Sequence, residues 1–212
     1  MKLSISSIDE SQKLRYLKDN LDFSPVRYYR SNSTVFTAGE PSRFLYIVDS
    51  GCLRVCRVTV DGRRQVCSFH FKGEVLGFDG SKLRQTYAEA IETSGVRALE
   101  LTGPVVRSNL IMQLYSAHLE KMQEQTLNLV TRNAIERLAA FLGDIASRQM
   151  ELDIVTLAMS RLDIAEHIGL TLETVSRSMH RLQEKKILEI ISARKLKFFH
   201  PALSEFLKNS CN

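Results

Sequence analysis

SRLDIAEHIGLTLETVSRSMHRLQEKKIL, residues 160–188, is the stretch that decides the fold of this 212-residue chain. Ser160 precedes Asp163 by three residues, a spacing that approximates a capping box at the start of a helix. Gly169 predicts the end of that helix, because glycine tolerates the left-handed backbone common at helix C-termini. We expect the helix to bury one face, formed by Ile164, Ala165 and Ile168.

A second helix is expected directly after this turn. Leu170 is placed to fill the turn, and Thr171 is placed to cap the new helix. Apolar residues then recur at steps of four and three, which predicts a buried face made of Val175, Met179 and Leu182. Two short helices joined by a tight turn predict a helix-turn-helix.

The opposite face of the second helix carries the residue types that read DNA bases. Arg177 can donate two hydrogen bonds to guanine, Glu173 can accept one from cytosine, and Ser176 can do either. An ordinary solvated helix could carry the same charges. The spacing of Ala165, Gly169 and Val175 favours the helix-turn-helix instead.

Basic residues gather around and after this motif. The net charge of +5 and the pI near 9.1 permit an anionic partner without requiring one. LEIISARKLKFF, residues 188–199, predicts a basic hairpin around residues 192–194, which completes a winged-helix outline. We expect contacts to the DNA backbone from Ser160, Thr171, Thr174, His180, Arg181, Lys185 and Lys195.

The N-terminal part has a different pattern. Residues 20–101 contain short strand-like runs separated by turn signals at PSR (41–43), DSG (49–51), DG (61–62) and FDG (78–80). This pattern predicts a small antiparallel barrel or roll. With the C-terminal helices, it makes the chain an α+β protein.

The Asp61-Gly62 pair predicts a β-hairpin with a two-residue loop, in which both turn residues have positive φ. Pairing of residue 60 with 63 and of 59 with 64 would place Cys56 opposite Cys67. The two thiols are then a possible redox pair, and two packed, reduced thiols are the alternative.

Residues 104–132 predict a long helix, because they contain no glycine or proline after Pro104. Five residues recur at alternating steps of three and four, which favours a dimer seam over a helix that only covers its own domain: Tyr115, His118, Met122, Gln125 and Leu129. The next helix, AIERLAAFLGDIASRQ, opens a second domain. The expected segments are therefore an effector-like roll at 1–103, a dimerisation helix at 104–132 and a DNA-binding domain at 133–212.

These features together resemble the CRP/FNR superfamily of transcription regulators. LETVSR at 172–177 is similar to the E-x-x-S-R recognition helix of the FNR and FixK branches. GEVLGFDG at 73–80 and YAEAIETS at 87–94 resemble the family's roll, which binds cyclic nucleotides in one branch. The resemblance implies that Glu173, Ser176 and Arg177 read a TTGA-type half-site within a homodimer. It also implies contact with RNA polymerase and favours activation.

The cysteines argue against the iron–sulfur cluster of the FNR branch. That cluster uses a group of cysteines ahead of the roll, and this chain has none before Cys52. Cys52 and Cys56 would lie about 13 Å apart along one strand. We therefore expect a FixK-like regulator without a cofactor or metal.

Two other signals stay open as alternatives. The cyclic-AMP branch is matched in part by Gly73, Glu74 and Arg84, but Gln85 follows where a serine or threonine is expected, and Met122 and Gln123 stand where that branch has hydroxyls. A haem-based nitric-oxide regulator would use His70 or His118 as an iron ligand.

Other classes of protein are not supported by the sequence. The chain lacks a P-loop, a dinucleotide fingerprint, an HExxH pair and a G-x-S-x-G elbow, so we expect no enzyme. The start, MKLSISSIDE, lacks the features of a signal peptide, and no stretch is long enough to span a bilayer. We expect a cytoplasmic protein with reduced cysteines and no membrane contact.

Overall fold

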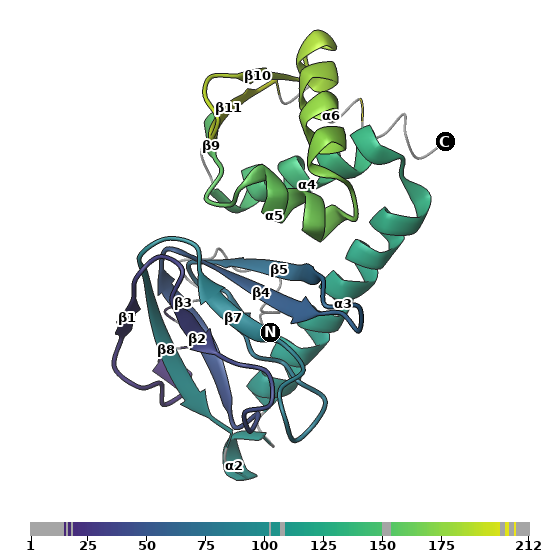
Figure 1. Cartoon of the computed structure of the whole chain (residues 1–212). Helices are drawn as coiled ribbons and strands as arrows, with labels where there is room; N and C mark the ends of the chain where they lie inside the picture. Colours follow the sequence, from purple (N-terminus) through teal and green to yellow (C-terminus); the bar gives the residue numbers. More distant parts are fainter. Residues whose placement is uncertain are drawn as a thin grey trace. The chain divides into compact units, whose positions relative to one another are not determined.

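The structure is a computed structural model that describes residues 15, 17, 19–101, 103–106, 109–149, 154–199, 202–203 and 206. The chain divides into two compact units, residues 1–123 and 124–212. Figure 1 shows the β-rich first unit and the helical second unit. The signal-peptide prediction concerns residues 1–10, which lie outside the described residues.

The first unit contains two antiparallel four-stranded sheets, with strand orders β1-β8-β3-β6 and β2-β7-β4-β5. Its strands are β1 (Arg27–Tyr29), β2 (Thr34–Phe36), β3 (Phe44–Ser50), β4 (Cys52–Val58), β5 (Arg64–Phe71), β6 (Val75–Leu76), β7 (Tyr87–Ala90) and β8 (Ser94–Glu100). The expected antiparallel roll is confirmed. The described strands of this unit form two sheets and no closed barrel.

Strand β3 is buried on both of its faces, which explains its run of apolar residues. Val48 packs with Leu53 and Val55 of strand β4 in the core between the two sheets. Leu45 and Ile47 alternate with it and face the other way, in a core that includes two residues of helix α3, Ile111 and Leu114. Helices α2 (Gly103–Val106) and α3 (Asn109–Thr131) follow the last strand.

The hairpin between β4 and β5 is present, but its loop is longer than expected. The Thr59 N–H donates to the Arg63 carbonyl (2.8 Å), and the Gly62 N–H donates to the Thr59 carbonyl (2.9 Å). Gly62 has a φ of 79°, and Asp61 is not among the residues with positive φ. The loop is therefore a turn closed by a left-handed glycine. The prediction of a two-residue loop was wrong.

This longer loop changes which residues face each other. Cys56 pairs with Val66, while Val55 pairs with Ser68, so Cys67 is the extra residue of a β-bulge. Cys67 packs against the core between the sheets, and the Cys56 thiol is hydrogen-bonded to Tyr87 instead. The prediction that Cys56 lies opposite Cys67 was therefore wrong, and the geometric argument for a redox pair is lost.

Both thiols also lie in surroundings that disfavour the reactive thiolate. Burial raises the pKa of Cys56 to about 12, and it raises the pKa of Cys67 as well. A thiol with a raised pKa stays protonated near neutral pH and is a poor nucleophile. Both cysteines are free in the structure.

The second unit is a winged helix-turn-helix, as expected. Its elements are α4 (Ala134–Gln149), β9 (Ile154–Thr156), α5 (Arg161–Ile168), α6 (Leu172–Glu184), β10 (Leu188–Ile190) and β11 (Lys195–Phe198). The three strands form one antiparallel sheet in the order β10-β11-β9. The boundary between the two units falls within helix α3, whereas the sequence predicted that helix as a segment of its own.

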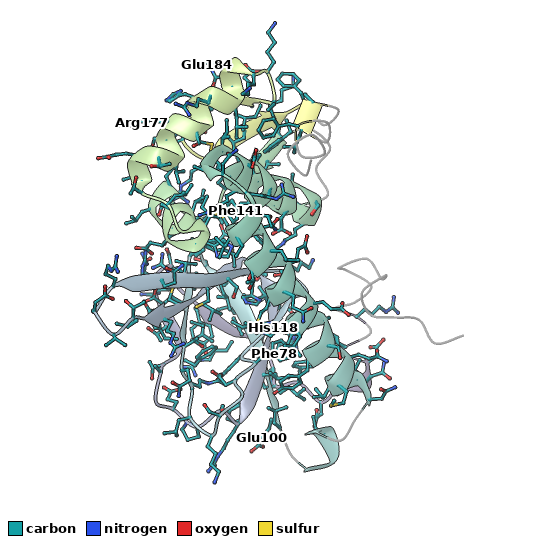
Figure 2. All side chains as sticks on the ribbon, turned by 90° about the vertical axis from the view of Figure 1, so that its right-hand side faces the viewer. Phe78, Glu100, His118, Phe141, Arg177 and Glu184 are labelled. Atoms are coloured by element: carbon teal, nitrogen blue, oxygen red, sulfur yellow. The ribbon has the colours of Figure 1, made fainter. Side chains whose placement is uncertain are left out.

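Two of the five expected seam residues contact the roll of their own chain. The His118 ring stacks on the Phe78 ring with centroids 4.6 Å apart, and the Tyr115 ring meets Phe78 edge-on at 4.9 Å. Figure 2 shows His118 and Phe78 next to each other. These two side chains therefore pack within the chain, and the dimer seam itself stays a prediction. Met122 and Leu129 are exposed.

Candidate nucleic-acid interface

Helix α5 begins with a complete capping box, as predicted. The Asp163 N–H donates to Ser160 Oγ (3.1 Å), and the Ser160 N–H donates to Asp163 Oδ2 (3.0 Å). The Asp163 side chain also accepts a hydrogen bond from the Ser160 hydroxyl, and the residue is 3% exposed. The cap satisfies N–H groups that the first turn cannot pair internally. The cap thereby fixes Arg161 as the first residue of α5.

The turn between α5 and α6 also has the expected residues in the expected roles. Gly169 adopts a φ of 68° and ψ of 41°, and its N–H donates to the Ala165 carbonyl. Thr171 is the N-cap of α6, where its Oγ1 accepts the Thr174 N–H at 3.1 Å. These two caps set the point at which the recognition helix begins.

Helix α6 separates cleanly into a buried and an exposed face. Its buried residues are Val175, Ser178, Met179 and Leu182, of which the sequence predicted all but Ser178. Glu173 and Arg177 are exposed and lie one helical turn apart, and Ser176 between them is half-buried. Figure 2 marks Arg177 on this helix. A carboxylate, a hydroxyl and a guanidinium are thus presented together near a helix N-terminus.

Arg161 is a candidate interface residue that the sequence reasoning missed. It is the first residue of α5, and its Nη1 donates to the Ser176 hydroxyl at 3.5 Å. This contact places a second guanidinium beside the residues expected to read bases. The signal in the sequence was a basic residue directly after the predicted helix cap, Ser160.

Most of the residues predicted to contact the DNA backbone are exposed: Ser160, Thr171, His180, Arg181, Lys185 and Lys195. Thr174 is half-buried, and its hydroxyl lies 2.9 Å from that of Thr171. Lys185 ends helix α6, and Lys195 begins strand β11. All seven residues lie in the second unit. Their contact with phosphates stays a prediction.

The wing is tied to the segment that leads into helix α5. The Arg194 side chain donates to the Ala158 carbonyl (2.9 Å), and the Leu157 N–H donates to the Arg194 carbonyl (2.7 Å). Ser192 Oγ accepts the Lys195 N–H at 3.1 Å, which closes the hairpin turn. These contacts position the exposed amine of Lys195 on the winged sheet.

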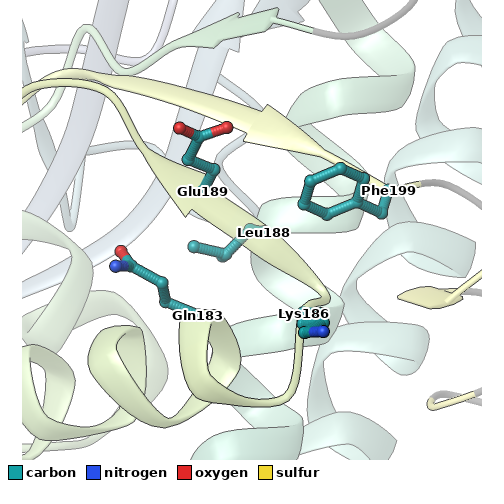
Figure 3. Close-up of a pocket in the computed structure, with 5 residues that line it drawn as sticks. All are labelled: Gln183, Lys186, Leu188, Glu189 and Phe199. Carbon is teal, nitrogen blue, oxygen red and sulfur yellow. The ribbon is translucent and has the colours of Figure 1, made fainter.

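A cavity of about 420 Å³ lies where helix α6 meets the wing. Figure 3 shows the five residues that line it: Gln183, Lys186, Leu188, Glu189 and Phe199. Gln183 Oε1 accepts the Ile190 N–H at 3.2 Å, so this side chain holds strand β10 to the helix. None of the predicted base-reading residues lines the cavity.

The two histidines considered as haem ligands both have contacts within the roll. His70 is buried, with Nε2 2.8 Å from the Ser68 hydroxyl and Nδ1 3.8 Å from the Glu74 carboxylate. Burial and the nearby Lys121 lower the pKa of His118, which stacks on Phe78. Within the described ranges, no group of three or more His, Cys, Asp or Glu side chains is arranged to hold a metal ion.

Comparison with known proteins agrees with this architecture. Residues 136–201 match the Crp-like helix-turn-helix domain, and residues 26–107 match the cyclic nucleotide-binding domain. The nitrogen fixation regulation protein FixK of Rhizobium meliloti (strain 1021) is 34% identical over 187 residues, which cover 88% of this chain and 87% of that protein. This chain belongs to the CRP/FNR family, in its FixK-like branch.

Further relatives support the assignment of this FixK-like regulator. The fumarate and nitrate reduction regulatory protein of Escherichia coli (strain K12) is 34% identical over 175 residues, covering 76% of this chain and 70% of that protein. The solved structure of FixK2 from Bradyrhizobium japonicum has a TM-score of 0.78 at 30% identity and covers 87% of this chain and 97% of that one. The chain is a transcription regulator and not an enzyme. No described helix has the length and apolar character needed to cross a membrane.

Proposed function

We propose that this FixK-like regulator binds a TTGA-type palindrome as a homodimer and activates transcription in the cytoplasm by contact with RNA polymerase. The carrying observation is the exposed pair Glu173 and Arg177, one turn apart with Ser176 between them, at the capped start of α6. An acidic side chain next to DNA weakens general attraction to phosphates. Its presence there makes sense when it accepts a hydrogen bond from a base.

The homodimer is supported by apolar side chains left exposed on helix α3. Met112, Leu119 and Met122 are 58%, 57% and 51% exposed, and recur at steps of seven and three. Such spacing forms a seam between two helices. We propose that Met112 and Leu119 take the place of Tyr115 and His118, which pack on Phe78 of their own chain, in the seam expected from the sequence. Met122 and Leu129 keep their expected roles.

We propose that control needs no iron–sulfur cluster. The chain has no cysteine before Cys52, and Cys52 and Cys56 lie on one strand, β4, where both are buried. FixK-like regulators are expected to be governed by their abundance, which agrees with a chain that binds DNA without a sensor group.

The test of base reading is a comparison of two charge-removing variants on two DNAs. We expect Arg177→Ala to lose about 1–3 kcal/mol of binding free energy on the palindrome and much less on a scrambled duplex. Lys195→Ala is the matched control, because it should weaken both complexes similarly by losing a phosphate contact. Binding constants come from fluorescence anisotropy at fixed salt. Equal losses for Arg177→Ala on both duplexes would refute the base-reading role.

A further inference from the structure

We propose that Asp79 is a built-in substitute for an anionic ligand in the cyclic nucleotide-binding domain of this chain. Asp79 lies in the segment between strands β6 and β7, and its side chain is 4% exposed. Its two carboxylate oxygens have separate partners. Arg84 Nη1 donates to Oδ2 at 2.8 Å, and the Gln85 backbone N–H donates to Oδ1 at 3.3 Å. A guanidinium beside a backbone N–H is a typical binding arrangement for a small oxyanion.

All the contacts of the Arg84 guanidinium are to groups of its own domain. Its side chain is 1% exposed, and Nη2 donates to the Phe44 carbonyl at 2.6 Å. The guanidinium carbon lies 4.0 Å from the centroid of the Phe36 ring and 5.3 Å from that of Tyr46. Aromatic faces and a carbonyl stabilise the cation, and Asp79 neutralises it. No part of the guanidinium is left to face solvent.

The backbone around the site is shaped to this side chain. Gly77 has a φ of 94°, and a Cβ there would lie 3.2 Å from Arg84 Nη1 and 3.0 Å from the Phe44 carbonyl oxygen. Glycine therefore allows the close approach of its own carbonyl to Arg84 Nη1, at 3.4 Å. The site is preformed around a buried arginine.

The second polar residue that matches the cyclic-AMP branch is also engaged internally. Glu74 is 7% exposed, and its Oε1 accepts a hydrogen bond from Lys121 Nζ of helix α3 at 3.3 Å. Its Oε2 accepts the Phe71 N–H at 3.2 Å. The residues present thus do not fit a cyclic nucleotide, because one internal anion and one internal cation already satisfy the arginine and the glutamate.

The proposal predicts that removal of Asp79 creates a phosphate site. In Asp79→Ser, Arg84 loses its buried counter-ion, and we expect the Tm to fall by about 6–20 °C. Inorganic phosphate should restore much of this loss, relative to sodium chloride at equal ionic strength, because it binds the folded state. Wild type should show only the small general rise that phosphate gives to folded proteins, well below the rise in Asp79→Ser. The measurement is thermal unfolding, which does not involve DNA, so its failure leaves the proposed DNA binding untouched.

Two control variants separate the anion site from general effects of phosphate. Asp79→Asn keeps the volume of the side chain, so phosphate should not restore its Tm. Asp79→Ser combined with Arg84→Met removes both charges and should also lack the phosphate response. Should Asp79→Ser fail to fold in chloride, the yield of refolded protein in phosphate against chloride becomes the readout. Equal phosphate responses in the single and double variants, or binding of cyclic AMP to the wild type by calorimetry, would overturn the proposal.

Discussion

Helices α5 and α6 are each followed by a residue with a left-handed backbone. This backbone suits the glycine after α5 and is unfavourable for the lysine after α6. Gly169 ends helix α5 at a φ of 68°, where glycine has no steric penalty. Lys186 follows helix α6 at a φ of 57°, in the same left-handed region. The Ile187 N–H donates to the Leu182 carbonyl, and the Lys186 N–H to the Gln183 carbonyl, which is a Schellman motif. A lysine occupies the position that glycine usually takes.

We therefore expect Lys186→Gly to raise the free energy of unfolding by about 1 kcal/mol, since the left-handed backbone costs a lysine that much. Gly169→Ala should lower it by about the same amount. A Cβ at residue 169 would have no atom closer than 3.9 Å, so backbone strain alone sets that loss. Urea unfolding measures both. Lys186→Ala is the control for lost charge, and an equal gain from Lys186→Ala and Lys186→Gly would contradict the role of strain.

For helix α3, the stripe of residues that the sequence predicts as a dimer seam differs from the stripe that the structure leaves exposed. A step of three and four residues predicts a seam but does not select between neighbouring stripes of one helix. Tyr115 and His118 pack on Phe78, which lies more than thirty residues earlier in the chain, and no local pattern shows this contact. The exposed stripe with Met112 and Leu119 became visible only once the roll was in place.

Leu119→Glu tests the proposed seam at this scale. A charge in the centre of an apolar helix pair loses burial and repels its symmetry mate, so we expect a monomer at micromolar concentration. Sedimentation velocity measures the change in mass. Val60→Glu is the matched control, because Val60 is an exposed valine at the tip of the β4-β5 hairpin. A dimer that persists in Leu119→Glu would rule out this stripe as the seam.

Hairpins and caps show why some elements could be predicted in detail and others only in outline. The caps at Ser160, Gly169 and Thr171 depend on neighbours within four residues, so the sequence predicted them correctly. The pairing of Cys56 depends on the loop length at Gly62 and on a bulge at Cys67. The alternation of apolar residues along each strand does not reveal this bulge, because the pairs from Cys52 to Val55 keep the register that a two-residue loop predicts and only the pairs nearest the turn are shifted. Arg84 and Asp79 likewise meet through tertiary structure.

The whole molecule combines a roll in which Arg84 and Glu74 form internal ion pairs with a winged helix-turn-helix whose exposed residues we propose to read DNA. The sequence predicted both units, since each has its own hydrophobic period, and the comparison with FixK proteins confirms the family. We propose that the protein and its DNA target share a two-fold symmetry, in which α3 forms the dimer and α6 contacts the DNA. A homodimer presents two copies of α6, and its half-sites should lie about 10 base pairs apart, centre to centre.

Binding of the purified chain to a TTGA-N6-TCAA duplex, without any added ligand, tests this account most directly. The comparison is with a scrambled duplex across a range of salt concentrations, with the protein-to-DNA ratio measured in the same samples. The account predicts selective binding of two chains per palindrome, at least about a thousandfold tighter than binding to the scrambled duplex. Weak, unselective binding, or one chain bound to a single half-site, would contradict it.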